Sequence, residues 1–123
     1  LGREGNLLIT ASFISIGEVF PLVSGFGGVC YPAHVDRPSF SVVANLGSFD
    51  ESWGFANAEM SAFAQADRLI EEHPLLRKMR LLRASDAHCL ENVGLANTEL
   101  ELPCASPQAV IDLLKGNYYL QGM

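Results

Sequence analysis

Short apolar runs alternate along the chain with amphipathic segments that carry helix start and stop signals. The apolar runs predict strands at Val29–Pro32, Ala56–Ser61 and Lys78–Ala84. Alternation of polar and apolar residues predicts a late strand at Glu99–Leu102. Residues 48–55 have the composition of a loop. Each predicted strand is therefore short.

Four segments predict helices. The first follows a capping box, with Ser15 at the N-cap and Glu18 three residues later, and should end near Gly25. The other three are Phe40–Leu46 with Ser39 as its cap and Gly47 as its stop, Ala64–His73 ended by Pro74, and Pro107–Lys115 capped by Ser106 and ended by Gly116. Because helices alternate with short strands, we expect an α/β fold with mostly parallel strands.

Polar clusters follow two of the predicted strands. Val29–Pro32 leads into His34, Asp36 and Arg37, and Lys78–Ala84 leads into Asp86 and His88. Carboxylate and imidazole groups suit zinc, iron or manganese, and a guanidinium suits phosphate. The second cluster, residues 85–88, also fits a Ser/Asp helix-capping turn with a partly exposed histidine. Both interpretations stay open on the residues alone.

Composition narrows the class of protein. The 123 residues are 49% hydrophobic and 18% charged, which fits one globular domain with a sizeable core. A net charge of −6 without a basic cluster argues against nucleic acid as a partner. No apolar run reaches the roughly 18 residues that span a membrane. Three widely spaced cysteines do not form a disulfide framework, so we expect a reducing cytoplasm.

The two polar clusters resemble a known family. The segments 32–41, Pro-Ala-His-Val-Asp-Arg-Pro-Ser-Phe-Ser, and 85–94, Ser-Asp-Ala-His-Cys-Leu-Glu-Asn-Val-Gly, are similar to those of the PHP (polymerase and histidinol phosphatase) superfamily of metal-dependent phosphoesterases. The resemblance covers roughly residues 7–115. It implies a distorted, TIM-like β/α barrel with its site at the carboxyl ends of the strands. There, divalent metal ions activate a water that attacks a phosphate ester.

The resemblance also implies roles for individual residues. His34, Asp86 and His88 would be metal ligands, and Asp86 and His88 would form the catalytic motif. From its chemistry and position, we expect Arg37 to contact the substrate phosphate. Asp36 would either orient His34 from behind or pair with Arg37. The metal could be zinc, manganese or iron, because all three accept these ligands.

The chain also departs from the family pattern. It has three histidines, His34, His73 and His88, and no His-x-His pair. A whole β/α barrel has about 250 residues, so we expect residues 1–123 to be a single partial PHP domain, the C-terminal half of the barrel.

Two functional hypotheses follow. The chain is part of a phosphoesterase that acts on a phosphorylated small molecule and is inactive in isolation. Alternatively, it is a non-catalytic half-barrel with a structural or protein-association role. In either case we expect self-association through the exposed half-barrel edge.

Overall fold

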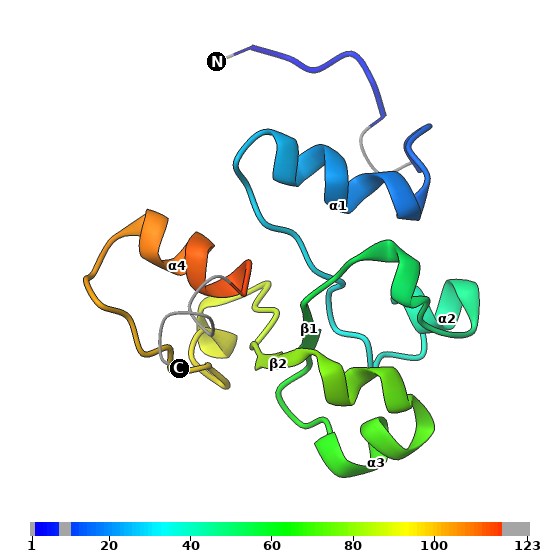
Figure 1. Ribbon diagram of the computed structural model, residues 1–123, viewed down its shortest axis with the longest axis vertical. Coiled ribbons are helices and arrows are strands. Elements are labelled where there is room, and N and C mark those ends of the chain that lie inside the picture. Colours follow the sequence, from blue (N-terminus) through cyan, green and yellow to red (C-terminus); the bar gives the residue numbers. More distant parts are fainter. Residues whose placement is uncertain (1, 8–10, 117–123) are drawn as a thin grey trace.

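Two short parallel strands form the centre of the structure, a computed structural model that describes residues 2–7 and 11–116. Strand β1 (Asn57–Met60) pairs with β2 (Arg80–Arg83), with Asn57 opposite Arg80 and Met60 opposite Arg83. The chain crosses between them through helix α3 (Ala66–Glu72) and the 3₁₀ helix η2 (Pro74–Lys78). This is a β-α-β unit, the usual connection between parallel strands (Figure 1).

The largest buried cluster lies between the strands and the α3–η2 crossover. Its buried members are Val35, Ala58, Met60, Leu69 and Leu76. Ala58 and Met60 alternate along β1 and therefore point to the same face of the sheet. This apolar face of β1 thus packs against the apolar side of α3 and η2.

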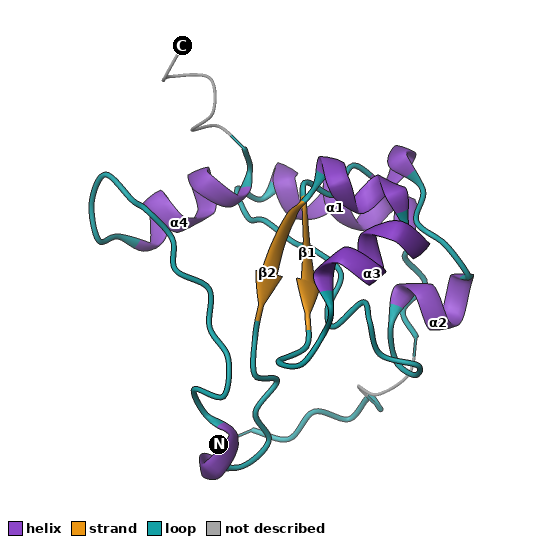
Figure 2. Ribbon diagram, turned by 90° about the horizontal axis from the view of Figure 1, so that it is seen from below, coloured by secondary structure: helices purple, strands orange, loops and turns teal. Residues whose placement is uncertain are grey.

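Helix α4 lies on the opposite side of the strand pair from α3 (Figures 1 and 2). It spans Pro107–Leu114 and is capped by Ser106, whose hydroxyl accepts the Ala109 N–H at 3.1 Å. The side chain of Asn57, which is 1% exposed, donates to the carbonyl of Leu114 at 2.5 Å. A single buried amide therefore ties the end of α4 to the start of β1.

The remaining helices follow the predicted signals with one shift. Helix α1 (Ile16–Gly25) has the predicted capping box, in which Ser15 and Glu18 bond reciprocally. Helix α2 (Val42–Leu46) ends at Gly47 as predicted, but its cap is Ser41 and not Ser39. The reason is tertiary: the buried Ser41 hydroxyl accepts the N–H of Ala44 and donates to the carbonyl of Arg37. Short 3₁₀ turns complete the list of helical elements, η1 (Glu51–Trp53) in the predicted loop and η3 (Leu90–Asn92).

The predicted strand at Val29–Pro32 is wrong as a regular strand. The segment still lies beside β1, because the Glu59 N–H donates to the carbonyl of Pro32 at 2.9 Å and the Val35 N–H donates to the carbonyl of Glu59 at 2.8 Å. In a regular parallel ladder, the two partners of Glu59 on the neighbouring strand would be two positions apart in sequence. Here the partners are Pro32 and Val35, which are three positions apart. One extra residue therefore bulges from this segment, next to His34 with its positive φ of 28°.

The predicted strand at Glu99–Leu102 is also wrong, since the segment is irregular. Its neighbour Thr98 contacts β2 through its side chain. The Thr98 hydroxyl accepts the Arg83 N–H at 2.6 Å and donates to the Arg83 carbonyl at 2.9 Å. A side chain thus bonds the backbone of β2 where a neighbouring strand would bond it through its own backbone.

The described residues contain mixed helix and strand with a two-stranded parallel sheet. The TIM-like half-barrel stays a prediction. Among the helices of residues 2–7 and 11–116, none combines the length and the apolar character needed to cross a bilayer.

Candidate functional site

The loop after β2 meets residues 29–37, called the bulged segment from here on, near one end of the strand pair. Arg37 lies in the bulged segment and Asp86 in the loop. Nη1 of Arg37 is 3.1 Å from Oδ2 of Asp86. The side chain of Asp86 is 24% exposed and that of Arg37 is 46% exposed, so the ion pair is accessible to solvent.

The second oxygen of Asp86 contacts His88. Oδ1 of Asp86 lies 3.4 Å from Nε2 of His88, and the His88 side chain is 85% exposed. Asp86 has a positive φ of 47°, in the left-handed region that non-glycine residues seldom adopt. One carboxylate therefore contacts a guanidinium and an imidazole. Of the five residues singled out from the sequence, Arg37 and His88 thus both contact Asp86.

His34 lies in the same bulged segment, but the described contacts do not join its side chain to Asp86 or His88. Its backbone N–H donates to Oε1 of Glu59 at 3.3 Å. Its Nδ1 atom is buried and has no hydrogen-bond partner among the described protein atoms. A buried imidazole nitrogen without a partner is unusual, because desolvation of a polar atom is costly. This nitrogen is therefore a candidate ligand for a group from outside the chain.

Asp36 occupies a different position from the two that the sequence suggested. We expected its carboxylate beside His34 or Arg37. Instead, Oδ1 accepts the backbone N–H of Ser61 at 2.7 Å, and Oδ2 accepts the Ser61 hydroxyl. Ser61 directly follows β1, so Asp36 connects the bulged segment to the carboxyl end of that strand.

Glu59, which was not among the predicted site residues, is bonded to the bulged segment through both its backbone and its side chain. Its backbone bonds residues on both sides of the bulge, and its carboxylate bonds His34. Burial raises the pKa of the Tyr31 phenol above its ordinary value of 10.0, and the neighbouring Glu59 carboxylate raises it further. Tyr31 was also missed. Its position three residues before His34 is the only sequence signal for it.

The Asp86 carboxylate and the His88 imidazole are two groups at this site that could bind a divalent metal. Two ligands of one tetrahedral zinc ion, with bonds of about 2.0–2.1 Å, are separated by about 3.4 Å. Asp86 Oδ1 and His88 Nε2 have this separation. Within the part of the chain that the structure describes, however, no three His, Cys, Asp or Glu side chains come together as a possible metal site. The residues fit a metal as a ligand pair, with further ligands required.

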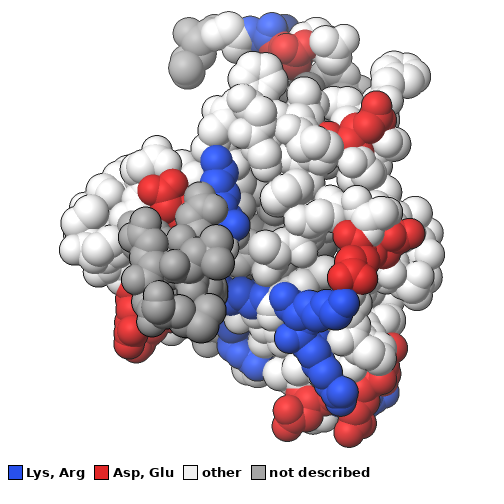
Figure 3. Space-filling model, in the orientation of Figure 1, with Lys and Arg blue, Asp and Glu red and all other residues white. Residues whose placement is uncertain are grey.

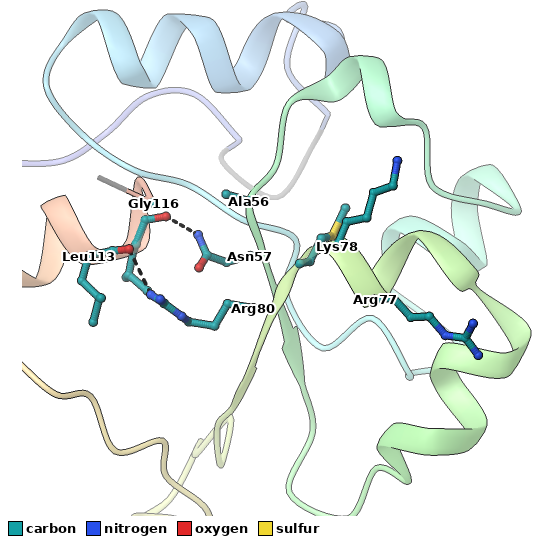
Figure 4. A pocket seen from close by; sticks show the side chains of 9 residues that line it. Ala56, Asn57, Arg77, Lys78, Arg80, Leu113 and Gly116 are labelled. Carbon is teal, nitrogen blue, oxygen red and sulfur yellow. Dashed lines mark hydrogen bonds between the residues drawn. The ribbon is translucent and has the colours of Figure 1, made fainter. Parts of the chain in front are cut away.

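A second feature lies at the other end of the strands and has a structural explanation. A cavity of about 310 Å³ is lined by Arg77, Lys78 and Arg80, among others. On the face drawn in Figure 3, Lys and Arg side chains gather beside the strand pair. Figure 4 shows Arg80 turned toward Leu113, whose carbonyl accepts from its Nη1 at 3.0 Å, whereas Arg77 and Lys78 point away. Lys78 pairs with Glu51 at 2.8 Å. These cations thus do not converge on one point.

Comparison with known families finds a match to one part of the chain. Residues 77–117 match the family model described as PHP-associated. These residues are a PHP-associated C-terminal region. The match covers about a third of the 123 residues and includes β2, Asp86, His88 and α4. No curated protein matches the chain, and no solved structure does.

The extent of the match divides the candidate site. Asp86 and His88 lie in the PHP-associated region, whereas His34, Asp36 and Arg37 precede it. The Arg37–Asp86 ion pair is therefore the contact that joins the earlier segment to the PHP-associated region at the site. The match includes the motif around Asp86, whereas the motif around His34 lies outside it, so that part of the resemblance stays a prediction.

Proposed function

We propose that this chain is part of a PHP-type metal-dependent phosphoesterase, and that residues 32–37 and 85–88 contribute to its site. The contact of Asp86 with both Arg37 and His88 carries the proposal. It brings a cation suited to phosphate next to a carboxylate–imidazole pair suited to a metal. The strand pair would then be part of the predicted β/α barrel, with this site at the carboxyl ends of its strands.

Each residue has a proposed role. Asp86 and His88 would hold a divalent ion, with His34 Nδ1 as a ligand from the bulged segment. Arg37 would contact the phosphate of the substrate. Asp36 would keep the bulged segment in place through Ser61. When bound, a divalent ion would supply a Lewis acid and lower the pKa of a water molecule. The free thiols of the three cysteines agree with our proposal of a cytoplasmic location.

The isolated chain should have little or no activity. The candidate ligands of a metal centre are a contacting pair and one separate histidine, whereas catalytic zinc sites use three protein ligands. Additional ligands would have to come from another segment of a longer protein or from a partner.

The test measures metal uptake and hydrolysis separately. We expect the purified chain to bind Mn²⁺ weakly and Asp86→Asn to abolish this binding, while p-nitrophenyl phosphate hydrolysis with added Mn²⁺ or Zn²⁺ stays near background. His73→Ala is the matched control, because His73 packs against Phe49 with ring centroids 5.7 Å apart, away from the site. Turnover that His88→Ala abolishes and His73→Ala preserves would show that the isolated chain is active.

A protein-association role is the second candidate, and exposed surface favours it. The chain exposes 9010 Å², whereas a compact monomer of 13.3 kDa exposes roughly 6,500 Å². Large apolar side chains contribute to this surface; those more than 80% exposed are Phe13, Phe26, Phe40, Phe63 and Leu90. Surface of this kind is typical of interaction sites. Light scattering should therefore show a dimer or larger species. A monodisperse monomer over a tenfold concentration range would contradict this candidate.

A further inference from the structure

Arg37 forms an ion pair with the Asp86 carboxylate, which the proposed function assigns to a metal ion. Its Nη1 lies 3.1 Å from Oδ2 of Asp86, while Oδ1 contacts His88. A guanidinium and a divalent cation on one carboxylate repel each other, because both are positive and only a few ångströms would separate them. In the arrangement described, Arg37 therefore opposes cation binding at Asp86.

The backbone of Arg37 is fixed, but its side chain is accessible. The Arg37 N–H donates to the carbonyl of His34 at 3.0 Å, and the Arg37 carbonyl accepts the Ser41 hydroxyl at 2.8 Å. The side chain is 46% exposed, so its remaining N–H groups can reach an anion from solvent. A guanidinium binds a tetrahedral oxyanion through two parallel hydrogen bonds. An anion can thus neutralise or withdraw Arg37 without unfolding the segment.

We infer that Arg37 competes with a divalent cation for Asp86, so that an oxyanion bound by Arg37 strengthens cation binding at Asp86 and His88. The inference rests on the proposed function and adds regulation of the same site. By linkage, the cation must strengthen oxyanion binding by the same factor. Metal and phosphate group would therefore bind together more tightly than either binds alone.

This coupling differs from a simple phosphate-binding role of Arg37. If Arg37 only held substrate, its removal would leave cation affinity unchanged. Under the competition that we infer, Arg37→Gln removes the competing charge and tightens cation binding in the absence of anions. The cation affinity of Arg37→Gln, measured without catalysis, therefore distinguishes the two possibilities: it is unchanged in the first and higher in the second.

The experiment follows free Mn²⁺ by its electron paramagnetic resonance signal, with the full chain at low ionic strength. Sulfate serves as the tetrahedral oxyanion, because it stays in solution with Mn²⁺. We expect Arg37→Gln to bind Mn²⁺ about fivefold or more tightly than the unaltered chain, in the usual range of coupling between sites. Sulfate should tighten Mn²⁺ binding by the unaltered chain and have no effect on Arg37→Gln.

Arg68→Gln is the matched control, since Arg68 pairs with Glu72 on the exposed side of α3, and it should behave as the unaltered chain. Arg37→Lys keeps the positive charge and should retain part of the competition, and circular dichroism verifies that each variant is folded. Equal or weaker Mn²⁺ binding by Arg37→Gln, with binding lost in Asp86→Asn, overturns the inference and leaves the proposed metal site standing. Absence of Mn²⁺ binding in every variant overturns both.

Discussion

Asp36 binds Ser61 through both carboxylate oxygens, one to the backbone N–H at 2.7 Å and the other to the hydroxyl. Ser61 is the residue after β1, and Asp36 lies between His34 and Arg37. The bulged segment is thus attached to the sheet at its carboxyl end by a side chain. The position of two candidate site residues depends on this attachment.

Removal of the Asp36 carboxylate should therefore destabilise the fold and loosen the site. We expect Asp36→Ala to lower the free energy of unfolding by about 1–3 kcal/mol, because hydrogen bonds to a charged group are among the stronger ones. Chemical denaturation measures this change.

A double-mutant cycle with Ser61→Ala should show coupling between the two positions. Glu71→Ala, on an exposed part of α3, should change stability by less than about 0.5 kcal/mol. Equal effects of the Asp36 and Glu71 substitutions would contradict the role of Asp36.

Asn57 should control the attachment of α4. Its side chain is 1% exposed and donates to the Leu114 carbonyl, so Asn57→Ala removes a buried hydrogen bond and leaves that carbonyl without its donor. We expect a loss of about 1–3 kcal/mol in the free energy of unfolding. Hydrogen exchange should quicken in α4 before it quickens in α3. Gln108→Ala is the control, because Gln108 bonds Asp112 on the exposed surface of the same helix. Unchanged exchange in α4 would argue against this attachment.

Local signals in the sequence predicted the helices better than the strands. The reciprocal bonds of Ser15 and Glu18 involve neighbouring residues, so their pattern is visible without the fold. The cap at Ser41 differs, since it depends on a bond to the carbonyl of Arg37 and on burial of the serine. A strand depends even more on distant partners. Pro32, at the end of the predicted strand Val29–Pro32, bonds β1, but a bulge interrupts regular pairing. Beside the predicted strand Glu99–Leu102, the contact with β2 comes from the hydroxyl of the preceding Thr98 and not from a backbone ladder.

The candidate site shows the same limit. Asp86 and His88 were predictable as residues that follow a strand, and Arg37 as part of a polar cluster; their contacts follow from the convergence of two segments at one end of the sheet. Their roles in metal and phosphate binding stay predictions. The partner of Asp36 could not be deduced from its neighbours, because the choice among His34, Arg37 and Ser61 depends on tertiary distances. The bond from the His34 N–H to Glu59 could not be deduced for the same reason.

Thr98 should hold the segment after η3 against β2. Its hydroxyl bonds both backbone groups of Arg83, so Thr98→Val should remove two hydrogen bonds while preserving shape. Because Thr98 is exposed, water can replace part of the loss, and we expect about 0.5–1.5 kcal/mol of destabilisation. Faster hydrogen exchange at the Arg83 amide is the specific readout. Thr98→Ser, which keeps the hydroxyl, should restore protection; failure to do so would contradict the role of the hydroxyl.

Tyr31 should make the fold sensitive to alkaline pH. Burial, with a smaller effect from Glu59, raises the pKa of the Tyr31 phenol above 10.0 in the folded state. A raised pKa means that the folded state keeps its proton at a pH where the unfolded chain has lost it. This contribution to stability is therefore fully present below about pH 10 and is lost as the pH rises toward the folded-state pKa.

Tyr31→Phe has no phenol to ionise, so its stability should fall less between pH 9.5 and 11.5. Glu59→Gln should lower the Tyr31 midpoint, followed by absorbance at 295 nm, yet leave it above 10.0 because burial is the larger cause. Parallel loss of stability in Tyr31→Phe and the unaltered chain would assign the alkaline transition to another group, such as the Cys30 thiol, whose pKa burial also raises.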